Sequence, residues 1–216
     1  MPPVNCTFDV PHYRELLRAA QFGGYRFAGF DRAPQAGELI LRHDVDLSLE
    51  AALVVAEIEA EEDAWSTWFL MTRSVFYNLA SKDGERAIAR LRELGHRVGH
   101  HAVYPDLDLD ERFDPVVAWH NPEPEFMWAE VPGIVNVMSP TFFDPDLYRS
   151  DSNQNWRHGC PHEALAGGEF EWLQLLIHPE IWVYDGATMR ESMTSFLDAD
   201  RAARLDHLRQ DRIDLS

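Results

Sequence analysis

The sequence predicts an α/β fold in which helices cover a parallel sheet or barrel. Short apolar runs alternate with segments of helical periodicity, as in chains built from βαβ units. The length of 216 residues suits one domain with a sizeable core, and 45% hydrophobic residues with 12% aromatic residues argue against disorder. No linker or internal repeat is evident, so residues 1–216 are expected to form a single domain.

Helices are expected where apolar residues recur with a period near 3.6 residues. This pattern covers residues 11–20, 49–62, 85–94 and 188–215. Gly95 follows the third segment in the position of a C-terminal cap. The fourth segment is expected to be a packing helix with an apolar side formed by Met189, Met193, Phe196 and Leu197. Nothing in it decides whether the protein forms oligomers.

Strands are expected at the short apolar runs, which are residues 39–41, 65–71, 97–101, 116–119, 134–138 and 173–177. Several of these runs end in polar side chains. Residues 106–132 are rich in proline and acidic residues, and we expect them to form long loops over the mouth of the sheet or barrel.

The most informative polar group follows the first run, where Arg42, His43, Asp44, Val45 and Asp46 lead into a helical segment. Side chains two residues apart on a strand share a face, so Asp44 and Asp46 should point the same way. Such strand-to-helix junctions carry the chemistry of many α/β proteins. The alternative is that both are only turn and cap residues.

Two further groups follow later strands. His96, His100 and His101 lie around the run 97–101, and His178 follows the run 173–177. Taken in order, Arg-His-Asp-Val-Asp, Gly-His-Arg-Val-Gly-His-His and Leu-Ile-His-Pro resemble the motifs of the polysaccharide deacetylase family (carbohydrate esterase family four), in its branch with an Arg-His-Asp-Val-Asp first motif. The resemblance covers roughly residues 7–185. It implies an irregular seven-stranded (β/α) barrel of the polysaccharide deacetylase type.

The resemblance also implies roles for single residues. Asp44 corresponds to the catalytic base, whereas Asp46 and His101 correspond to metal ligands. The family's remaining metal-binding histidine falls on Pro105, which cannot bind a metal. We take His120, at the end of the run 116–119, as the candidate replacement.

The other histidines of this region receive different readings. His100 is the alternative third ligand, because it and His101 point to opposite faces if both lie on one strand. His96 matches a family position that is not a ligand and is read as structural. Asn121, beside His120, is expected to contact the substrate.

Later residues complete the implied site. His178 corresponds to the family's general acid, and a histidine suits that task; a hydrogen-bonded core histidine is the alternative. The loop-like segment 150–159 resembles the family's Asp-Trp region, where Trp156 could stack on a sugar ring and Arg157 could bind Asp44 or a substrate carboxylate. Both side chains could instead cap the barrel rim.

These assignments imply a metal-dependent hydrolase that removes an N-acetyl group from an amino sugar or a precursor of a surface polysaccharide. The cofactor is expected to be a divalent metal, with zinc as the first candidate. One alternative is a catalytically silent carbohydrate-binding relative, suggested by Pro105. Another is a hydrolase of a different amide or a phosphoester on the same barrel.

Composition and charge argue against a nucleic-acid-binding protein and a membrane-spanning protein. The formal charge of −18, from 19 basic and 37 acidic residues, argues against binding nucleic acid or an anionic membrane surface. No run approaches the roughly 18 apolar residues that cross a bilayer. The start of the chain has neither a basic segment nor an apolar stretch of signal-peptide length, so a cytoplasmic protein is expected. Cys160 lies beside His158 and His162, which are metal-site residue types, although a free thiol is favoured.

Overall fold

The computed structural model of this protein describes residues 6–213. Both ends of the expected domain, residues 1–5 and 214–216, lie outside the described residues, including most of the N-terminal segment considered above and the end of the stretch 188–215. The strands are β1 Arg26–Ala28, β2 Glu38–Val45, β3 Thr67–Met71, β4 Arg97–Ala102, β5 Val116–Trp119, β6 Val135–Asn136, β7 Tyr148–Ser150 and β8 Trp172–Ile177.

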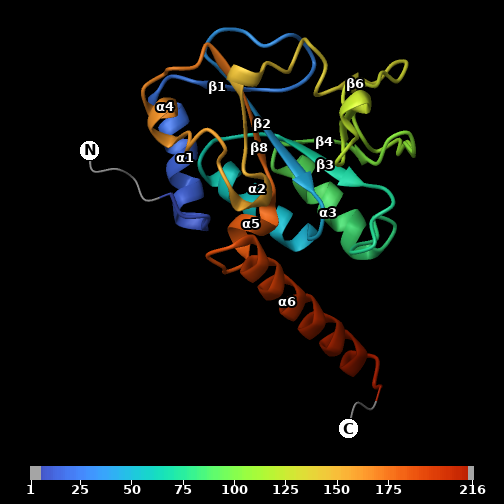
Figure 1. The fold of residues 1–216 in the computed structure, drawn as a ribbon. Helices are drawn as coiled ribbons and strands as arrows, with labels where there is room; N and C mark the ends of the chain where they lie inside the picture. Colours follow the sequence, from blue (N-terminus) through green and yellow to red (C-terminus); the bar gives the residue numbers. More distant parts are fainter. Residues whose placement is uncertain (1–5, 214–216) are drawn as a thin grey trace.

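Seven of these strands form one parallel sheet in the order β6-β5-β4-β3-β2-β8-β7. The eighth, β1, pairs in parallel with the first residues of β2. The sheet curls into a half-barrel whose edges are β6 and β7 (Figure 1). The predicted α/β class and seven-stranded barrel architecture are therefore confirmed.

Six helices of the described chain follow or precede these strands. They are α1 Val10–Phe22, α2 Leu49–Glu61, α3 Lys82–Glu93, α4 His162–Ala166, α5 Pro179–Val183 and α6 Met189–Gln210. Short polar side chains begin several of them: Asp9 accepts a hydrogen bond from the His12 amide of α1, and Ser48 accepts one from the Ala51 amide of α2. These bonds satisfy amide groups that lack partners within the helix.

The two faces of the sheet bury different sets of side chains. The outer face packs against helices in the large core, with Leu39, Leu41, Trp68, Leu70 and Leu175 among its members. The inner face fills the base of the barrel with a smaller apolar cluster: Ala28, Phe30, Ile40, Phe69, Val116, Ala118, Val137 and Phe142. The barrel is thus closed by apolar packing at the end where β2 begins.

Gly99 of β4 permits this tight inner packing. A Cβ atom at this position would lie 2.7 Å from Val116 Cγ1 and 2.8 Å from Phe69 Cε1, which is closer than carbon atoms approach without a clash. Glycine is therefore the residue that fits between β3 and β5.

The elements differ from the expectations in three places. β1, β7, α4 and α5 have short or polar sequences and were not predicted, and β6 has two residues in place of the five expected. Asp44 lies within β2, because this strand is longer than its apolar run.

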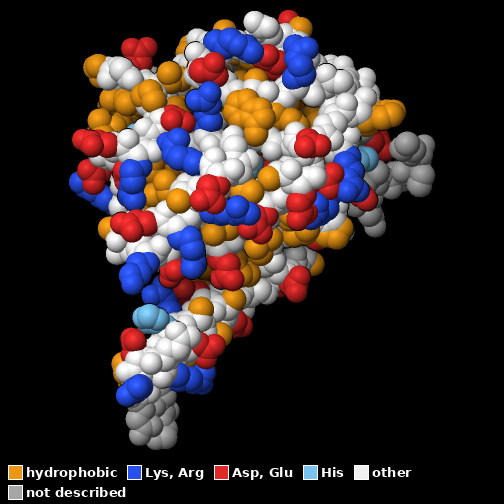
Figure 2. All heavy atoms as spheres, turned by 180° about the vertical axis from the view of Figure 1, so that it is seen from behind, with side chains coloured by type: hydrophobic (Ala, Val, Ile, Leu, Met, Phe, Trp, Pro, Cys, Tyr) orange, Lys and Arg blue, Asp and Glu red, His pale blue; other side chains and the backbone are white. Residues whose placement is uncertain are grey.

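The set of residues predicted to pack against the core from the last helix is wrong in part. Ser192 and Phe196 are the buried residues of α6, but Leu197 is 54% exposed. Beyond its first turns the helix extends away from the rest of the fold (Figure 1). Figure 2 shows acidic and basic side chains interspersed along it. Among the described residues, no helix combines the length and the apolar character that a bilayer crossing requires.

Candidate metal and catalytic site

Asp44 is held in an ionised state by a neighbour on its own strand. Arg42 forms a two-pronged ion pair with it, with Nε 2.8 Å from Oδ1 and Nη2 2.6 Å from Oδ2. Burial alone would raise the pKa of the Asp44 carboxyl, but the charge of Arg42 outweighs it and the pKa is lowered. Asp44 is consequently a buried carboxylate, fixed in orientation.

The guanidinium of Arg42 is itself held from two sides. Gln174 of β8 accepts a hydrogen bond from Arg42 Nη1 at 3.2 Å, and the ring of Phe69 lies 5.6 Å from its central carbon. Gln174 in turn donates to the carbonyl oxygens of Val137 and Phe142. This chain of contacts ties the orientation of Asp44 to strand β8 and to the base of the barrel.

Three side chains with metal-ligating atoms converge at the ends of β2, β4 and β5. Asp46 Oδ1 lies 2.9 Å from His101 Nε2 and 3.1 Å from His120 Nδ1, and the two ring nitrogens are 3.1 Å apart. The structure therefore brings together the carboxylate and both histidines that the sequence nominated as ligands. Asp44 borders this group, with Oδ2 3.9 Å from His101 Nε2.

The two ring nitrogens of His101 have different settings. Nδ1 lies 2.8 Å from the carbonyl oxygen of Ala118, an acceptor, whereas Nε2 faces Asp46 and His120. Metal-bound histidines usually have such a bond on their second nitrogen, because it fixes the ring. His120 has Asn121 beside its other nitrogen at 3.2 Å. Asn121 thus supports a proposed ligand as well as lining the cavity.

The other histidines of this region are structural. His100 lies on the outer face, where Nδ1 is 3.3 Å from the Val116 carbonyl oxygen and Nε2 accepts from the Asp110 amide. His96 donates to the carbonyl oxygen of Ala56. The alternative assignment of His100 as third ligand is therefore wrong, since strand alternation turns it away from Asp46. Pro105 is exposed on the loop after β4.

His178 follows β8 and is bound to a buried carboxylate. Its Nδ1 lies 2.6 Å from Asp151 Oδ1, and its backbone amide donates to Asp151 Oδ2 at 2.9 Å. Trp182 donates to the same carboxylate at 2.7 Å. Burial lowers the pKa of His178, but Asp151 more than compensates and raises it to about 10. The imidazole is therefore protonated at neutral pH.

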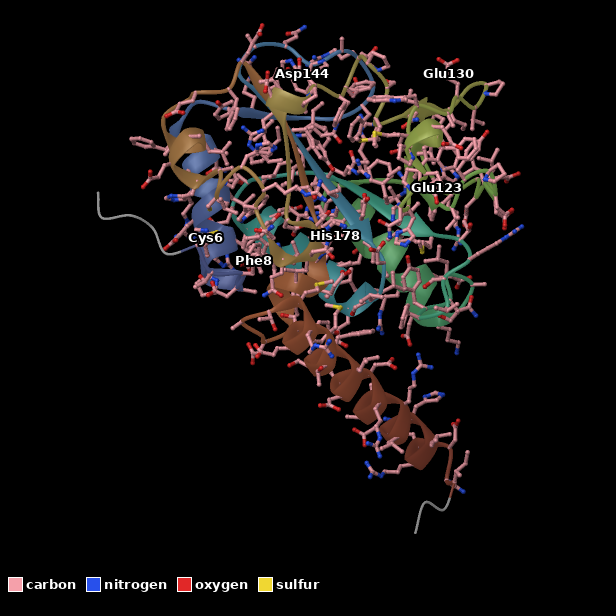
Figure 3. The ribbon with its side chains drawn as sticks, viewed as in Figure 1. Cys6, Phe8, Glu123, Glu130, Asp144 and His178 are labelled. Carbon is pink, nitrogen blue, oxygen red and sulfur yellow. The ribbon has the colours of Figure 1, made fainter. Side chains whose placement is uncertain are left out.

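One open cavity of about 500 Å³ connects all of these groups. Asp44, Asp46, His101, His120 and His178 line it. Aromatic side chains and, besides Arg42, two arginines complete the lining: Trp119, Phe143, Tyr148, Arg149, Trp156 and Arg157. Figure 3 places His178 near the centre of the molecule. The volume is in the range of small-molecule sites.

The sequence did not indicate how exposed Trp156 and Arg157, the two residues expected to bind substrate, would be. Trp156 lines the cavity, but it is 8% exposed and its ring stacks against Phe8 at 5.9 Å, so only part of it can meet a ligand. Arg157 is exposed at the cavity wall. Its suggested bond to Asp44 is made by Arg42 instead.

Sequence reasoning missed three supporting residues. Arg42 could have been found, because it lies two positions before Asp44 and shares its strand face. Gln174 and Asp151 left no comparable signal, because their roles depend on β8 lying between β2 and β7.

Comparison with known proteins adds little to this description. No protein-family profile matches the sequence, and no curated protein matches it significantly. One solved structure, a peptidoglycan deacetylase of Bdellovibrio bacteriovorus, is similar over 84% of this chain, with 16% identity and a TM-score of 0.38. This chain covers about half, 54%, of that protein. The function is therefore inferred from the residues of this chain.

Proposed function

We propose that this protein is a metal-dependent hydrolase that removes an N-acetyl group from an amino sugar or a surface-polysaccharide precursor. The observation that carries the proposal is the convergence of Asp46, His101 and His120 beside the ionised carboxylate of Asp44. Pro105 leaves the family-like ligand set incomplete, and His120 supplies the missing donor from a different strand.

The donor set fits a divalent transition metal. One carboxylate and two imidazoles are a common three-ligand set for catalytic zinc, which keeps a further position for water or substrate. The Nε2 atom of His101 faces Asp46 and His120, while Nδ1 is engaged with the carbonyl oxygen of Ala118. When bound, the ion supplies Lewis-acid chemistry at the mouth of the barrel.

Asp44 and His178 each carry out one of the two proton transfers of the proposed reaction. Asp44 is ionised and positioned to accept a proton from the attacking water, and Arg42 keeps it in that state. His178 is protonated and faces the same cavity, so it can donate a proton to the departing nitrogen. Asp151 holds the ring of His178 by Nδ1, which leaves Nε2–H as the donor.

The cavity supports a carbohydrate substrate. Aromatic rings such as Phe143 and Tyr148 offer apolar faces to a sugar ring, and Arg149 and Arg157 can bind hydroxyl or anionic groups. These features favour an amino sugar over a bare linear amide.

The test is acetate release from N-acetylglucosamine oligomers, a peptidoglycan fragment and a linear acetamide, each assayed with zinc, cobalt or chelator. We expect sugar-dependent release that the chelator abolishes and that His120→Ala reduces by about 100-fold. His207→Ala, on the exposed part of α6, is the control and should have no effect. Sugar binding without acetate release under any metal would indicate a silent carbohydrate-binding protein instead.

A further inference from the structure

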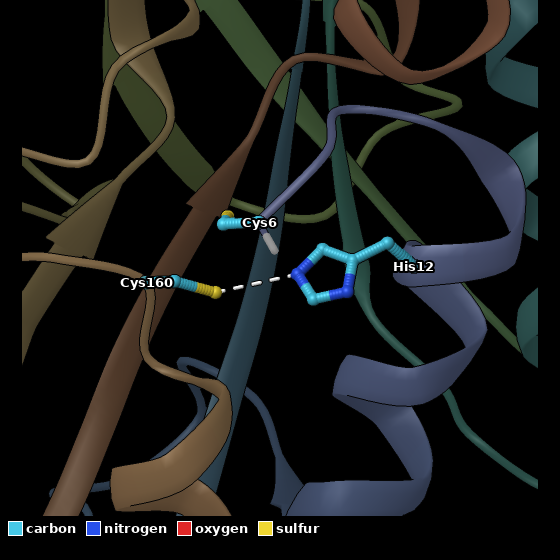
Figure 4. Close-up of side chains that lie close together, drawn as sticks. All are labelled: Cys6, His12 and Cys160. Atoms are coloured by element: carbon cyan, nitrogen blue, oxygen red, sulfur yellow. Dashed lines mark hydrogen bonds between the residues drawn. The ribbon is translucent and has the colours of Figure 1, made fainter. Parts of the chain in front are cut away.

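A second group of metal-ligating side chains lies away from the cavity. Cys6, His12 and Cys160 each place one ligand atom within 4.8 Å of the others. Cys6 lies in the segment before α1 and His12 in α1 itself, whereas Cys160 lies in the loop before α4, 148 residues after His12 (Figure 4). None of the three lines the cavity described above.

We propose that Cys6, His12 and Cys160 bind a zinc ion. Two sulfurs and one imidazole are the donor types that zinc and other thiophilic metals prefer. The inference is independent of the proposed function, because it concerns different residues.

The setting of His12 is the strongest observation for this site. The ring is buried, with 2% exposure, and its Nε2 lies 3.3 Å from Cys160 Sγ. Its other nitrogen, Nδ1, lies 3.0 Å from a carboxylate oxygen of Glu15. A carboxylate on the second nitrogen orients the ring and leaves Nε2 available to a metal, as in many zinc proteins.

The two sulfurs lie close enough to the imidazole for all three side chains to share one ion, because the ligand atoms of Cys6, His12 and Cys160 are within 4.8 Å of one another. Thiolate is the form of cysteine that binds metals. His162 adds a nearby donor: its ring lies 5.7 Å from that of His12, and its Nδ1 is buried without a hydrogen-bond partner in the described part of the chain.

The same contacts have another reading, because Cys160, His12 and Glu15 are arranged like a nucleophile, a base and an orienting carboxylate. The second sulfur argues against it. The sulfur of Cys6 lies within 4.8 Å of that of Cys160, and the described cavity that could hold a substrate lies elsewhere. Two adjacent sulfurs with one buried imidazole are better matched to a metal ion.

The test uses the full chain carrying Asp46→Ala and His120→Ala, so that the candidate catalytic site contributes no metal. After purification under reducing conditions, we expect elemental analysis to give one zinc per chain. Adding Cys160→Ser or Cys6→Ser should remove it, while His158→Ala, next to the cluster in sequence, is the matched control and should retain it.

Two further measurements keep the result independent of folding. Cobalt substitution should give the sulfur-to-cobalt charge-transfer absorption expected of thiolate ligands, and zinc should protect both thiols from alkylation until a chelator is added. Glu15→Gln leaves all three donors in place and should weaken zinc affinity about 10-fold. Absence of zinc with two alkylatable thiols, a Cys6–Cys160 disulfide in the reduced preparation, or zinc that survives both serine variants would each overturn the proposal.

Discussion

Asp44 lies in β2 and Asp46 follows two residues later, directly after the strand, yet they have different partners. Arg42 occupies both oxygens of Asp44 with hydrogen bonds, whereas Asp46 faces the imidazoles of His101 and His120. These partners make Asp44 suited to proton transfer and Asp46 suited to metal binding. Strand alternation predicted their shared face, but it could not predict which partners each would meet.

The first prediction concerns Asp44→Asn. The amide cannot accept the proton of the attacking water, so acetate release should fall by about 10³-fold or more. Zinc content should stay at the wild-type level, because the three proposed ligands are untouched. Asp198→Asn, on the exposed side of α6, serves as the control. Loss of metal from the Asp44 variant would contradict the separation of roles.

The second prediction concerns Asp151→Asn. A general acid works only when protonated, and Asp151 raises the pKa of His178 to about 10. Without this carboxylate, burial lowers the pKa of His178 against only the smaller opposing effects of Glu180 and Asp44. The alkaline limb of the kcat profile should therefore move down by about 2 pH units or more. Asp146→Asn, in the exposed turn before β7, is the control; an unmoved alkaline limb would exclude His178 as the acid.

At the scale of elements, each long apolar strand delivers its polar residues at the same end of the sheet. The sequence predicted these strands because their apolar runs are distinct, and it predicted α2 and α3 from their periodicity. It nominated His120 because Pro105 leaves a gap in the implied ligand set, but it had no geometric ground for placing His120 beside Asp46, because β5 and β2 are separated by β3 and β4. Only the curl of the sheet brings their ends together.

The third prediction concerns the start of α2, directly after Asp46. Ser48 accepts a hydrogen bond from the Ala51 amide at 3.0 Å, and its hydroxyl also lies 3.0 Å from that of Tyr184. Ser48→Ala should lower the free energy of unfolding by about 1 kcal/mol, which chemical denaturation can measure. Ser48→Thr keeps the acceptor and should lose less; an equal loss in both variants would mean that packing, not the cap, is responsible.

At the scale of the whole molecule, one buried carboxylate connects the helical layer to the sheet. Glu59 of α2 lies within 2.6 Å of polar atoms from Tyr13 of α1, His43 of β2 and Ser66 before β3. His96, before β4, lies 3.5 Å from its second oxygen. Sequence analysis gave Glu59 no role, because a glutamate in a helix is normally exposed.

The fourth prediction is that Glu59→Ala destabilises the protein by about 3 to 5 kcal/mol, because several buried polar groups lose their shared partner. Equilibrium unfolding in urea measures the loss. Glu57→Ala, an exposed neighbour on α2, is the control. A loss below about 1 kcal/mol would mean that the network is not an important source of stability.

The same network sets the response to acid. Burial lowers the pKa of His96 below 6.5, and the charge of His43 outweighs burial and lowers the pKa of Glu59 below 4.5. In both cases the unfolded chain takes up protons more readily than the folded one. Stability should therefore be complete above about pH 6.5 and should decline as the pH falls through these values. An unfolding free energy that is constant from pH 7 to 4 would contradict this.

The apolar cluster at the base of the barrel has a kinetic consequence. Phe30, Phe69 and Phe142 are buried in the base of the barrel, so the cavity is floored by apolar side chains on the side away from the strand ends. If the protein is the proposed deacetylase, a product that rebinds the free protein occupies the space that the substrate needs. Such a product, added at the start of an assay, should raise the apparent KM without changing kcat.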